Sequence, residues 1–171
     1  MSASTSTPLQ NHTPTINRGT WLYVGGNEPG NFSRIQQAID NASEGDTIFV
    51  YDDSSPYYEH VVINKSLHLI GENNQTTVID GNQTGDVMTI QADYVTVQGF
   101  MVRNSGDRNS AITLSSDHNT IVNMTIRGNE YGVSVVKSKE NTIAFNQIIY
   151  NGFGVRLLDA SVKNTISANT I

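Results

Sequence analysis

Three carboxylates, an imidazole and two phenols crowd into residues 52–60 of this chain. Carboxylates and imidazoles act as general acids and bases, and phenols stack on sugars and donate hydrogen bonds. The cluster is therefore the first candidate for catalysis or ligand contact. Its acid–base candidates are Asp52, Asp53, Glu59 and His60, and its candidate ligand contacts are Tyr57 and Tyr58. The alternative is a polar loop in which Tyr58 packs over the edge of a strand.

The elements that must position such residues are set by a repeat in the second half of the chain. Asn-Thr-Ile triplets recur at residues 119–121, 141–143 and 164–166, at intervals of 22 and 23 residues. Two further short apolar–polar–apolar triplets accompany each copy, so every unit predicts three short strands. A unit of this size cannot bury its own apolar face, and successive units must stack at the strand spacing of about 4.8 Å. The pattern predicts an all-β solenoid, a parallel β-helix with three strands per coil of about 22–24 residues.

The same register extends backward along the chain. Residues 88–90, 95–97 and 100–102 fill the preceding coil, and residues 67–69 occupy the position of 95–97 one coil earlier. The interval drifts to 24 and then to about 28 residues, as expected if turns absorb insertions.

Side chains alternate across a strand, so the middle residue of each triplet faces outward. The predicted outward rows hold one Arg and no carboxylate: Thr89, Thr113, Ser134 and Arg156; Thr96, Thr120, Thr142 and Thr165; Met101, Thr125, Gln147 and Thr170. Lyase or hydrolase chemistry on these faces lacks its acid and base. Polar walls with aromatic side chains nearby can bind sugars instead, which makes Tyr94 and Arg156 candidate ligand-binding residues.

One corner of successive coils carries asparagine in every repeat. Asn119, Asn141 and Asn164 share this position, where side-chain amides can hydrogen-bond from coil to coil and tolerate unusual backbone angles. We interpret them as a structural ladder rather than as a site.

The N-terminal part of the chain differs from the repeats. Residues 1–19 are Ser-, Thr-, Pro- and Asn-rich and predict a disordered or linker-like tail, followed by a β-helix domain over residues 20–171. A strand is expected at residues 21–24 and an amphipathic helix at about 33–42, with Ser33 and Gln36 as a capping box.

The sequence offers residues for a calcium site and few for a copper site. Asp93 and Asp117 share a corner position in successive coils and could bind calcium, although Lys139 takes that position in the next coil. Copper would need converging Met, His or Cys side chains. The chain has no cysteine, its four histidines are scattered, and Met124 aligns with Phe100 in an inward column. We therefore expect no cofactor. If the chain does bind a metal, calcium fits its residues better than copper does.

Composition restricts partners and location. The net charge is −6 without a basic cluster, which argues against nucleic acid as a partner. No apolar run approaches the roughly 20 residues of a membrane span, and the N-terminus shows no signal-peptide pattern. Seven Asn-x-Ser/Thr sequons favour an extracellular, cell-surface or periplasmic protein. They lie at Asn11, Asn31, Asn41, Asn64, Asn74, Asn82 and Asn123.

Several strings outside the repeat carry a family resemblance. They lie at residues 33–40, 45–48, 58–63, 65–72 and 79–81, ahead of the Asn-Thr-Ile coils. With these strings the chain resembles the pectate-lyase-like β-helix superfamily, specifically its Asn-rich, NosD-like branch of exported repeat proteins. The resemblance implies right-handed coils and an N-terminal helix that covers the open end of the solenoid. The superfamily includes polysaccharide lyases, hydrolases, esterases, epimerases, a copper-maturation accessory protein and surface proteins, so fold alone selects none of these activities.

Three hypotheses about function follow. The first is a non-catalytic extracellular or cell-envelope module that serves as a scaffold and binds polysaccharide. The second is a lyase, hydrolase or esterase acting on acidic polysaccharide through residues 52–60. The third is a copper-accessory protein of the NosD type.

The last repeat stops at residues 169–171, in the middle of a coil, and no C-terminal cap is visible. An open β-helix end presents unpaired strand edges. The sequence therefore predicts a truncated domain, or self-association and further coils at this end.

Overall fold

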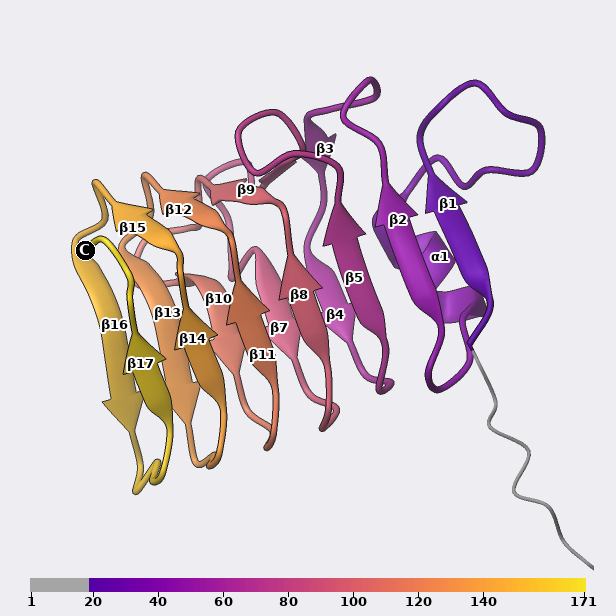
Figure 1. Ribbon diagram of the computed structural model, residues 1–171. Coiled ribbons are helices and arrows are strands. Elements are labelled where there is room, and N and C mark those ends of the chain that lie inside the picture. Colours follow the sequence, from indigo (N-terminus) through magenta and orange to yellow (C-terminus); the bar gives the residue numbers. More distant parts are fainter. Residues whose placement is uncertain (1–18) are drawn as a thin grey trace, which may run out of the picture.

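The computed structural model describes residues 19–171, and this range forms a parallel β-helix (Figure 1). The predicted tail lies outside the described residues, apart from Gly19. Each full coil contributes one strand to each of three parallel sheets, which confirms the predicted fold class. No helix in residues 19–171 is long and apolar enough to cross a bilayer.

The three sheets run the length of the solenoid. Sheet A contains β1 (Trp21–Val24), β2 (Thr47–Val50), β5 (His68–Gly71), β8 (Thr96–Gln98), β11 (Thr120–Val122), β14 (Thr142–Ala144) and β17 (Thr165–Ser167). Sheet B contains β3 (Tyr57–Tyr58), β6 (Val78–Asp80), β9 (Met101–Arg103), β12 (Thr125–Arg127) and β15 (Gln147–Ile149). Sheet C contains β4 (Val61–Ile63), β7 (Met88–Ile90), β10 (Ser110–Leu114), β13 (Tyr131–Val136) and β16 (Phe153–Leu158).

The predicted register is confirmed by the strand pairing. Thr120 pairs with Thr96 on one side and with Thr142 on the other, and Thr142 pairs with Thr165. His68 pairs with Thr96, so the early interval of 28 residues is also as predicted. The extra length of the early coils lies in the connections between strands, and the pairing itself is preserved.

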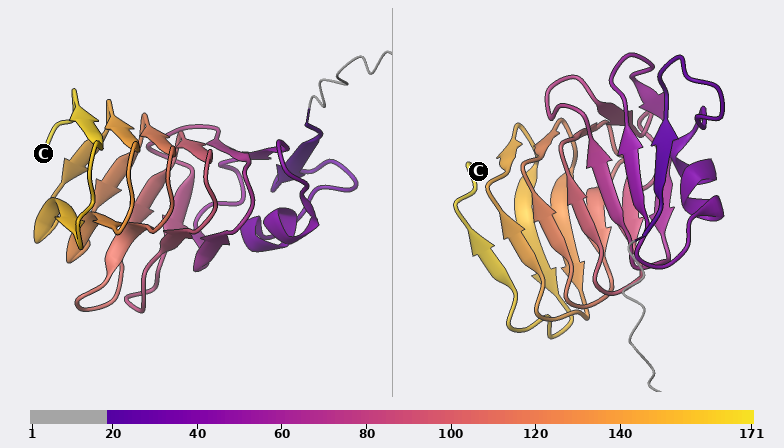
Figure 2. Two further views of the ribbon diagram at one scale, coloured as in Figure 1. Left: turned by 90° about the horizontal axis from the view of Figure 1, so that it is seen from below. Right: turned by 45° about the vertical axis from the view of Figure 1, so that its right-hand side comes forward.

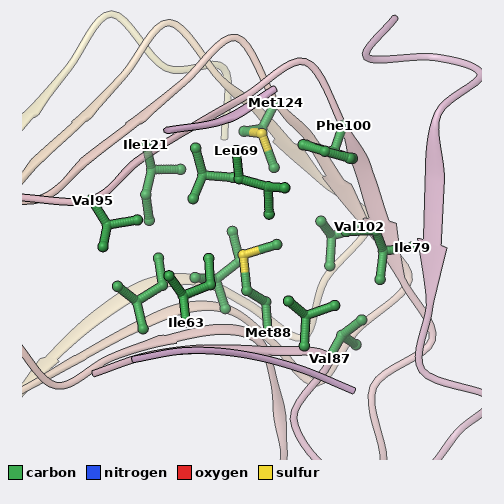
Figure 3. Close-up of a cluster of buried hydrophobic side chains, with 14 of the residues drawn as sticks. Ile63, Leu69, Ile79, Val87, Met88, Val95, Phe100, Val102, Ile121 and Met124 are labelled. Atoms are coloured by element: carbon green, nitrogen blue, oxygen red, sulfur yellow. The ribbon is translucent and has the colours of Figure 1, made fainter. Parts of the chain in front are cut away.

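The inward columns form one continuous apolar core (Figure 3). Phe100 and Met124 are both fully buried there, in agreement with their predicted inward column. Each fully buried Leu, Ile or Phe contributes about 1.5–3 kcal/mol relative to an exposed position. Because this stabilisation requires neighbouring coils, the coils are stable only as a stack.

Three residues of the predicted outward rows are covered. Ser134, Met101 and Thr125 are only 1%, 7% and 2% exposed. The loop between β5 and β6 reaches over sheet B, where Gln75 Nε2 donates to Thr125 Oγ1 at 2.8 Å. Ser134 lies on sheet C, where its hydroxyl contacts Ser110 Oγ and Arg156 Nε. The expectation that these three residues face solvent is therefore wrong, because strand periodicity does not show which loops and side chains of other coils cover a face.

Sharp corners join the strands, and many of them use one residue with positive φ. His118, Glu140 and Lys163 occupy the corner from sheet C to sheet A, with φ of 59°, 58° and 56°. The residues that follow them are Asn119, Asn141 and Asn164. Tyr94 has the same conformation one coil earlier, with φ of 59°.

The asparagines after these corners form a ladder along the solenoid. Asn141 Oδ1 accepts a hydrogen bond from the backbone N–H of Asn119 at 2.8 Å. Asn164 Oδ1 accepts one from the N–H of Asn141 at 3.0 Å. Asn141 Nδ2 donates to the carbonyl oxygen of Ser116 at 3.0 Å. These side chains satisfy backbone groups that the bend removes from strand pairing.

The other two corners carry ladders that the sequence analysis missed. From sheet A to sheet B, Asn169 Oδ1 accepts a hydrogen bond from the N–H of Asn146 at 2.9 Å. From sheet B to sheet C, Asn151 Oδ1 accepts one from the N–H of Asn129 at 3.1 Å. The signal was present in the sequence, since each pair recurs at the repeat interval.

Helix α1 (Ile35–Asn41) lies at the N-terminal end of the solenoid (Figure 2). Its buried residues are Ile35, Ala38 and Ile39, which confirms the predicted apolar face and its cover over the core. The predicted capping box is wrong. Arg34, not Ser33, occupies the N-cap position, and its side chain makes no capping hydrogen bond.

Candidate functional site on the outer face of sheet C

Glu59 contacts the first residues of helix α1. Its Oε1 accepts from the backbone N–H of Ile35 at 2.8 Å, and its Oε2 accepts from that of Gln36 at 3.0 Å. The side chain is 4% exposed, and Arg34 Nε lies 3.8 Å from it. Free N–H groups at a helix start favour a negative charge, so this carboxylate replaces the missing N-cap. It is not presented to a ligand.

Asp52 and Asp53 link loops of neighbouring coils. Asp53 Oδ1 accepts from the backbone N–H of Gly26 at 2.9 Å. Asp52 Oδ2 accepts from Thr76 Oγ1 at 2.5 Å. Asp52, Asp53 and Glu59 thus bond to different partners and do not converge on a common site.

The two tyrosines of this segment have opposite environments. Tyr57 is 4% exposed and its hydroxyl donates to the carbonyl oxygen of Tyr51 at 2.7 Å, whereas Tyr58 is 66% exposed. Burial, followed by the charges of Asp53, Glu59 and Asp52, raises the pKa of Tyr57 to about 12. The expected packing role of Tyr58 therefore belongs to Tyr57, and Tyr58 alone is open to a ligand.

His60 begins a polar network that continues across sheet C. Its Nδ1 lies 2.7 Å from the carbonyl oxygen of Asp86, and its Nε2 lies 3.0 Å from Thr84 Oγ1. The Asp86 carboxylate accepts from the N–H of Ser110 and from Thr113 Oγ1, both at 2.7 Å. Asp86 therefore joins the loop before β7 to strand β10. It was not among the predicted site residues, because loop residues carry no strand periodicity.

The network ends at Arg156, one of the predicted ligand-binding residues. The Oγ atoms of Ser110 and Ser134 lie 2.7 Å apart, and Arg156 Nε donates to Ser134 Oγ at 2.6 Å. The Arg156 guanidinium lies 3.3 Å from the centre of the Tyr131 ring. Phe153 stacks on Tyr131 from the next coil, with ring centroids 5.5 Å apart. These contacts fix the orientation of Arg156.

The hydroxyl and carboxylate groups of this network are engaged with one another. Ser110 and Ser134 are each 1% exposed, so neither hydroxyl is available as a nucleophile. Both carboxylate oxygens of Asp86 already accept hydrogen bonds. Within residues 19–171, no buried side-chain nitrogen or oxygen lacks a hydrogen-bond partner. What remains for a ligand is the part of the Arg156 side chain that stays accessible and the exposed ring of Phe153 beside it.

Asp80 accepts a hydrogen bond in the turn after β6 and also forms an ion pair. Its Oδ1 accepts from the N–H of Asn82 at 2.9 Å, and its Oδ2 accepts from Arg103 Nε at 2.8 Å. Burial acts to raise the pKa of Asp80, but hydrogen bonds from Asn82, Arg103 and Asn104 outweigh it and lower the pKa. An acid held in its charged form cannot donate a proton in catalysis.

The proposed calcium ligands bond to backbone groups of the following coil. Asp93 Oδ1 accepts from the N–H of Asp117 at 2.8 Å, and Asp117 Oδ1 accepts from the N–H of Lys139 at 2.9 Å. Lys139 Nζ lies 3.9 Å from Asp117 Oδ2. Beside this column, the Tyr94 ring stacks on His118 at 4.9 Å, and Tyr94 is 66% exposed.

Comparison with known proteins decides the family. The model of a family described as "Periplasmic copper-binding protein (NosD)" matches residues 37–171. The chain belongs to the NosD family. A cell surface glycoprotein of Methanothermus fervidus is 31% identical over 152 residues, which cover 71% of this chain and 25% of the relative. The NosD-family chain thus spans about a quarter of the length of that relative.

Two solved structures share the fold. A pectin methylesterase in complex with a hexasaccharide has a TM-score of 0.56 and 15% identity, over 74% of this chain and 54% of that one. A mutant pectin methylesterase with another hexasaccharide has a TM-score of 0.58 and 17% identity, over 82% and 54% of the two chains. At this identity the similarity shows the β-helix fold alone and nothing of activity.

The family description raises copper, and the side chains that residues 19–171 present do not fit it. Cu(I) prefers sulfur ligands, but Met88 and Met124 are fully buried among apolar side chains (Figure 3) and Met101 is 7% exposed. His118 Nδ1 pairs with Glu140 Oε2 at 3.2 Å, and His60 is engaged as described above. Among residues 19–171, no group of three or more His, Cys, Asp or Glu side chains is placed to hold a metal ion.

Proposed function

We propose that this NosD-family chain is a non-catalytic module of the cell envelope, a rigid scaffold that binds polysaccharide. The observation that carries the proposal is the engagement of the candidate acid–base groups in bonds between coils. Glu59 caps α1, Asp53 holds a neighbouring loop, and Asp86 joins β10 to the loop before β7. Such bonds stiffen a solenoid and leave its polar, aromatic outer walls for recognition.

The comparisons support two parts of the proposal, a location in the cell envelope and a carbohydrate ligand. The family is described as periplasmic and a relative is named a cell surface glycoprotein, which supports an envelope location. The structural neighbours were crystallised with hexasaccharides, which supports a sugar polymer as ligand.

Affinity electrophoresis through gels that contain single polysaccharides tests the proposal. We expect at least one polymer to retard the migration of the protein. The protein should release no reducing ends, unsaturated products or methanol from that polymer. Absence of retardation by every polymer tested would remove polysaccharide binding from the proposal.

The second candidate is an enzyme acting on acidic polysaccharide. The partly buried cation of Arg156, on a face that also presents the exposed ring of Phe153, favours an anionic ligand there. Turnover of polygalacturonate, methylated pectin or alginate that is lost in Asp53→Ala would establish this candidate. Asp53 is the better probe, because Glu59→Ala also removes the cap of α1.

A further inference from the structure

The outward face of sheet A contains two rows without any charged side chain. The first row follows the register Trp21, Thr47, His68, Thr96, Thr120, Thr142 and Thr165. The second row follows Tyr23, Phe49, Ile70, Gln98, Val122, Ala144 and Ser167. Both rows cross the strands that lie at the front of Figure 1. The first row is mostly threonine, and the second is mostly apolar, with Gln98 and Ser167 as its polar members.

Four aromatic side chains meet at the N-terminal end of these rows. We call Trp21, Tyr23, Phe49 and Tyr51 the aromatic platform. Tyr23 stacks on Trp21 at 6.3 Å and on Tyr51 at 6.2 Å between ring centroids. Phe49 meets Tyr51 edge to face at 5.0 Å. Trp21 and Tyr23 remain 52% and 38% exposed, so two large rings face solvent.

The platform has a fixed border. The loop after β1 closes through a hydrogen bond from the N–H of Gly25 to the carbonyl oxygen of Phe32 at 2.8 Å. Asn31 Nδ2 donates to the carbonyl oxygen of Gly25 at 2.7 Å. A Cβ atom on Gly26 would lie 3.0 Å from the Tyr51 ring, so this loop packs directly against the platform. Rings held in this way lose little conformational entropy on binding.

We infer that the aromatic platform and the adjoining Thr47–His68–Thr96 row bind an uncharged polysaccharide laid across the strands of sheet A. A sugar ring has an apolar C–H face that stacks on Trp or Tyr, and hydroxyl groups at its edge that hydrogen-bond to Thr and His. The row repeats at the strand spacing of about 4.8 Å, close to the length of one sugar unit in an extended chain.

The charge of the face decides the class of ligand. An acidic polymer needs cationic partners, and neither row contains Lys or Arg. Arg156 lies on a different sheet, sheet C. The inference rests on the proposed polysaccharide binding and adds to it the site and the ligand class.

Trp21 supplies a site-specific readout, because it is the only tryptophan of the chain. The experiment titrates the full chain with hydroxyethyl cellulose, xylan and dextran, and separately with polygalacturonate and alginate. It follows tryptophan emission together with affinity electrophoresis. At least one neutral polymer should shift the emission and retard migration, with little effect of added salt.

Variants locate the binding surface. Tyr23→Ala should weaken binding at least about tenfold, as for a central interface aromatic, while the exposed control Tyr150→Ala stays within about twofold. Circular dichroism and thermal melting show whether each variant is folded. If Tyr23→Ala fails to fold, Thr47→Lys places a charge beside the rings and should weaken neutral polymers in the same way.

Other results overturn the inference and separate it from the proposed function. Binding that survives Tyr23→Ala and Thr47→Lys, or binding only to acidic polymers that is lost in Arg156→Ala, overturns the site but keeps polysaccharide binding. Sedimentation that shows a dimer which dissociates in Tyr23→Ala assigns the platform to a second copy of the chain. Failure of every polymer removes both the inference and the polysaccharide part of the proposed function.

Discussion

Glu59 and Lys65 lie on either side of strand β4 and cap the two ends of helix α1. Glu59 accepts from the N–H groups of Ile35 and Gln36, while Lys65 Nζ donates to the carbonyl oxygens of Ile39, Asp40 and Ala42 at 3.0, 2.8 and 2.7 Å. A carboxylate at the helix start and an ammonium at its end both match the helix dipole. One short strand thus fixes the cap over the solenoid end.

Glu59→Ala should lower the free energy of unfolding by about 2 kcal/mol, because it leaves two N–H groups of the helix without an acceptor. Lys65→Met should lower it by about 1 kcal/mol. Urea denaturation measures both. Glu28→Ala, a change at an exposed carboxylate, is the control and should stay within about 0.5 kcal/mol of wild type. Wild-type stability in Glu59→Ala would contradict the capping role.

Asn141→Ala should destabilise the fold by about 2–3 kcal/mol. Its side chain is fully buried and bonds to backbone groups of Ser116 and Asn119, which the substitution leaves unpaired. Thr142→Ala changes the next residue, which faces outward. This control should lower the free energy of unfolding by less than about 1 kcal/mol. Equal losses in the two variants would show that the ladder adds nothing beyond local strand packing.

Phe145→Gly should stabilise the protein by about 0.5–1 kcal/mol. Phe145 is 71% exposed and has φ of 57°, a conformation that costs a side chain with a Cβ atom and costs glycine nothing. Gln147→Gly, two residues later in an extended strand, should destabilise by a similar amount. Thermal melting of both variants tests the opposite signs, and a loss of stability in Phe145→Gly would contradict the prediction.

Tyr57 should make stability fall at alkaline pH. Its pKa is raised to about 12 in the folded protein, against about 10 for an ordinary tyrosine, so the folded state holds the proton more tightly. This contribution is complete below about pH 10 and is lost as the pH rises through about 12. The difference in unfolding free energy between wild type and Tyr57→Phe should therefore be constant below pH 10 and shrink above it. A difference that is unchanged at high pH would contradict the assignment.

Calcium should leave the melting temperature unchanged. Asp93 and Asp117 already accept backbone hydrogen bonds, and Lys139 brings a positive charge to Asp117. Melting in EDTA and in about 1 mM calcium, a concentration that fills many extracellular calcium sites, provides the measurement. A rise in melting temperature that disappears in Asp93→Asn would instead establish the calcium site.

The fold was predictable from the repeat, because every coil meets the same physical requirement. Every coil must present apolar side chains to the same interior, so the triplets around Thr96, Thr120, Thr142 and Thr165 recur in register, and strand pairing follows directly from their alignment. The asparagine positions recur for the same reason, and the two unpredicted ladders were readable at the same interval.

The roles of the non-repeating residues could not be predicted in this way and emerge from contacts between coils. Glu59 looked like an acid because it stands beside His60, Asp52 and Asp53, but its partner is a helix start 24 residues earlier. The aromatic platform was invisible for a similar reason, since Trp21 and Tyr23 meet Phe49 and Tyr51 only after β1 pairs with β2. Side-chain partners across coils depend on loop lengths and rotamers, and a local pattern in the sequence contains neither.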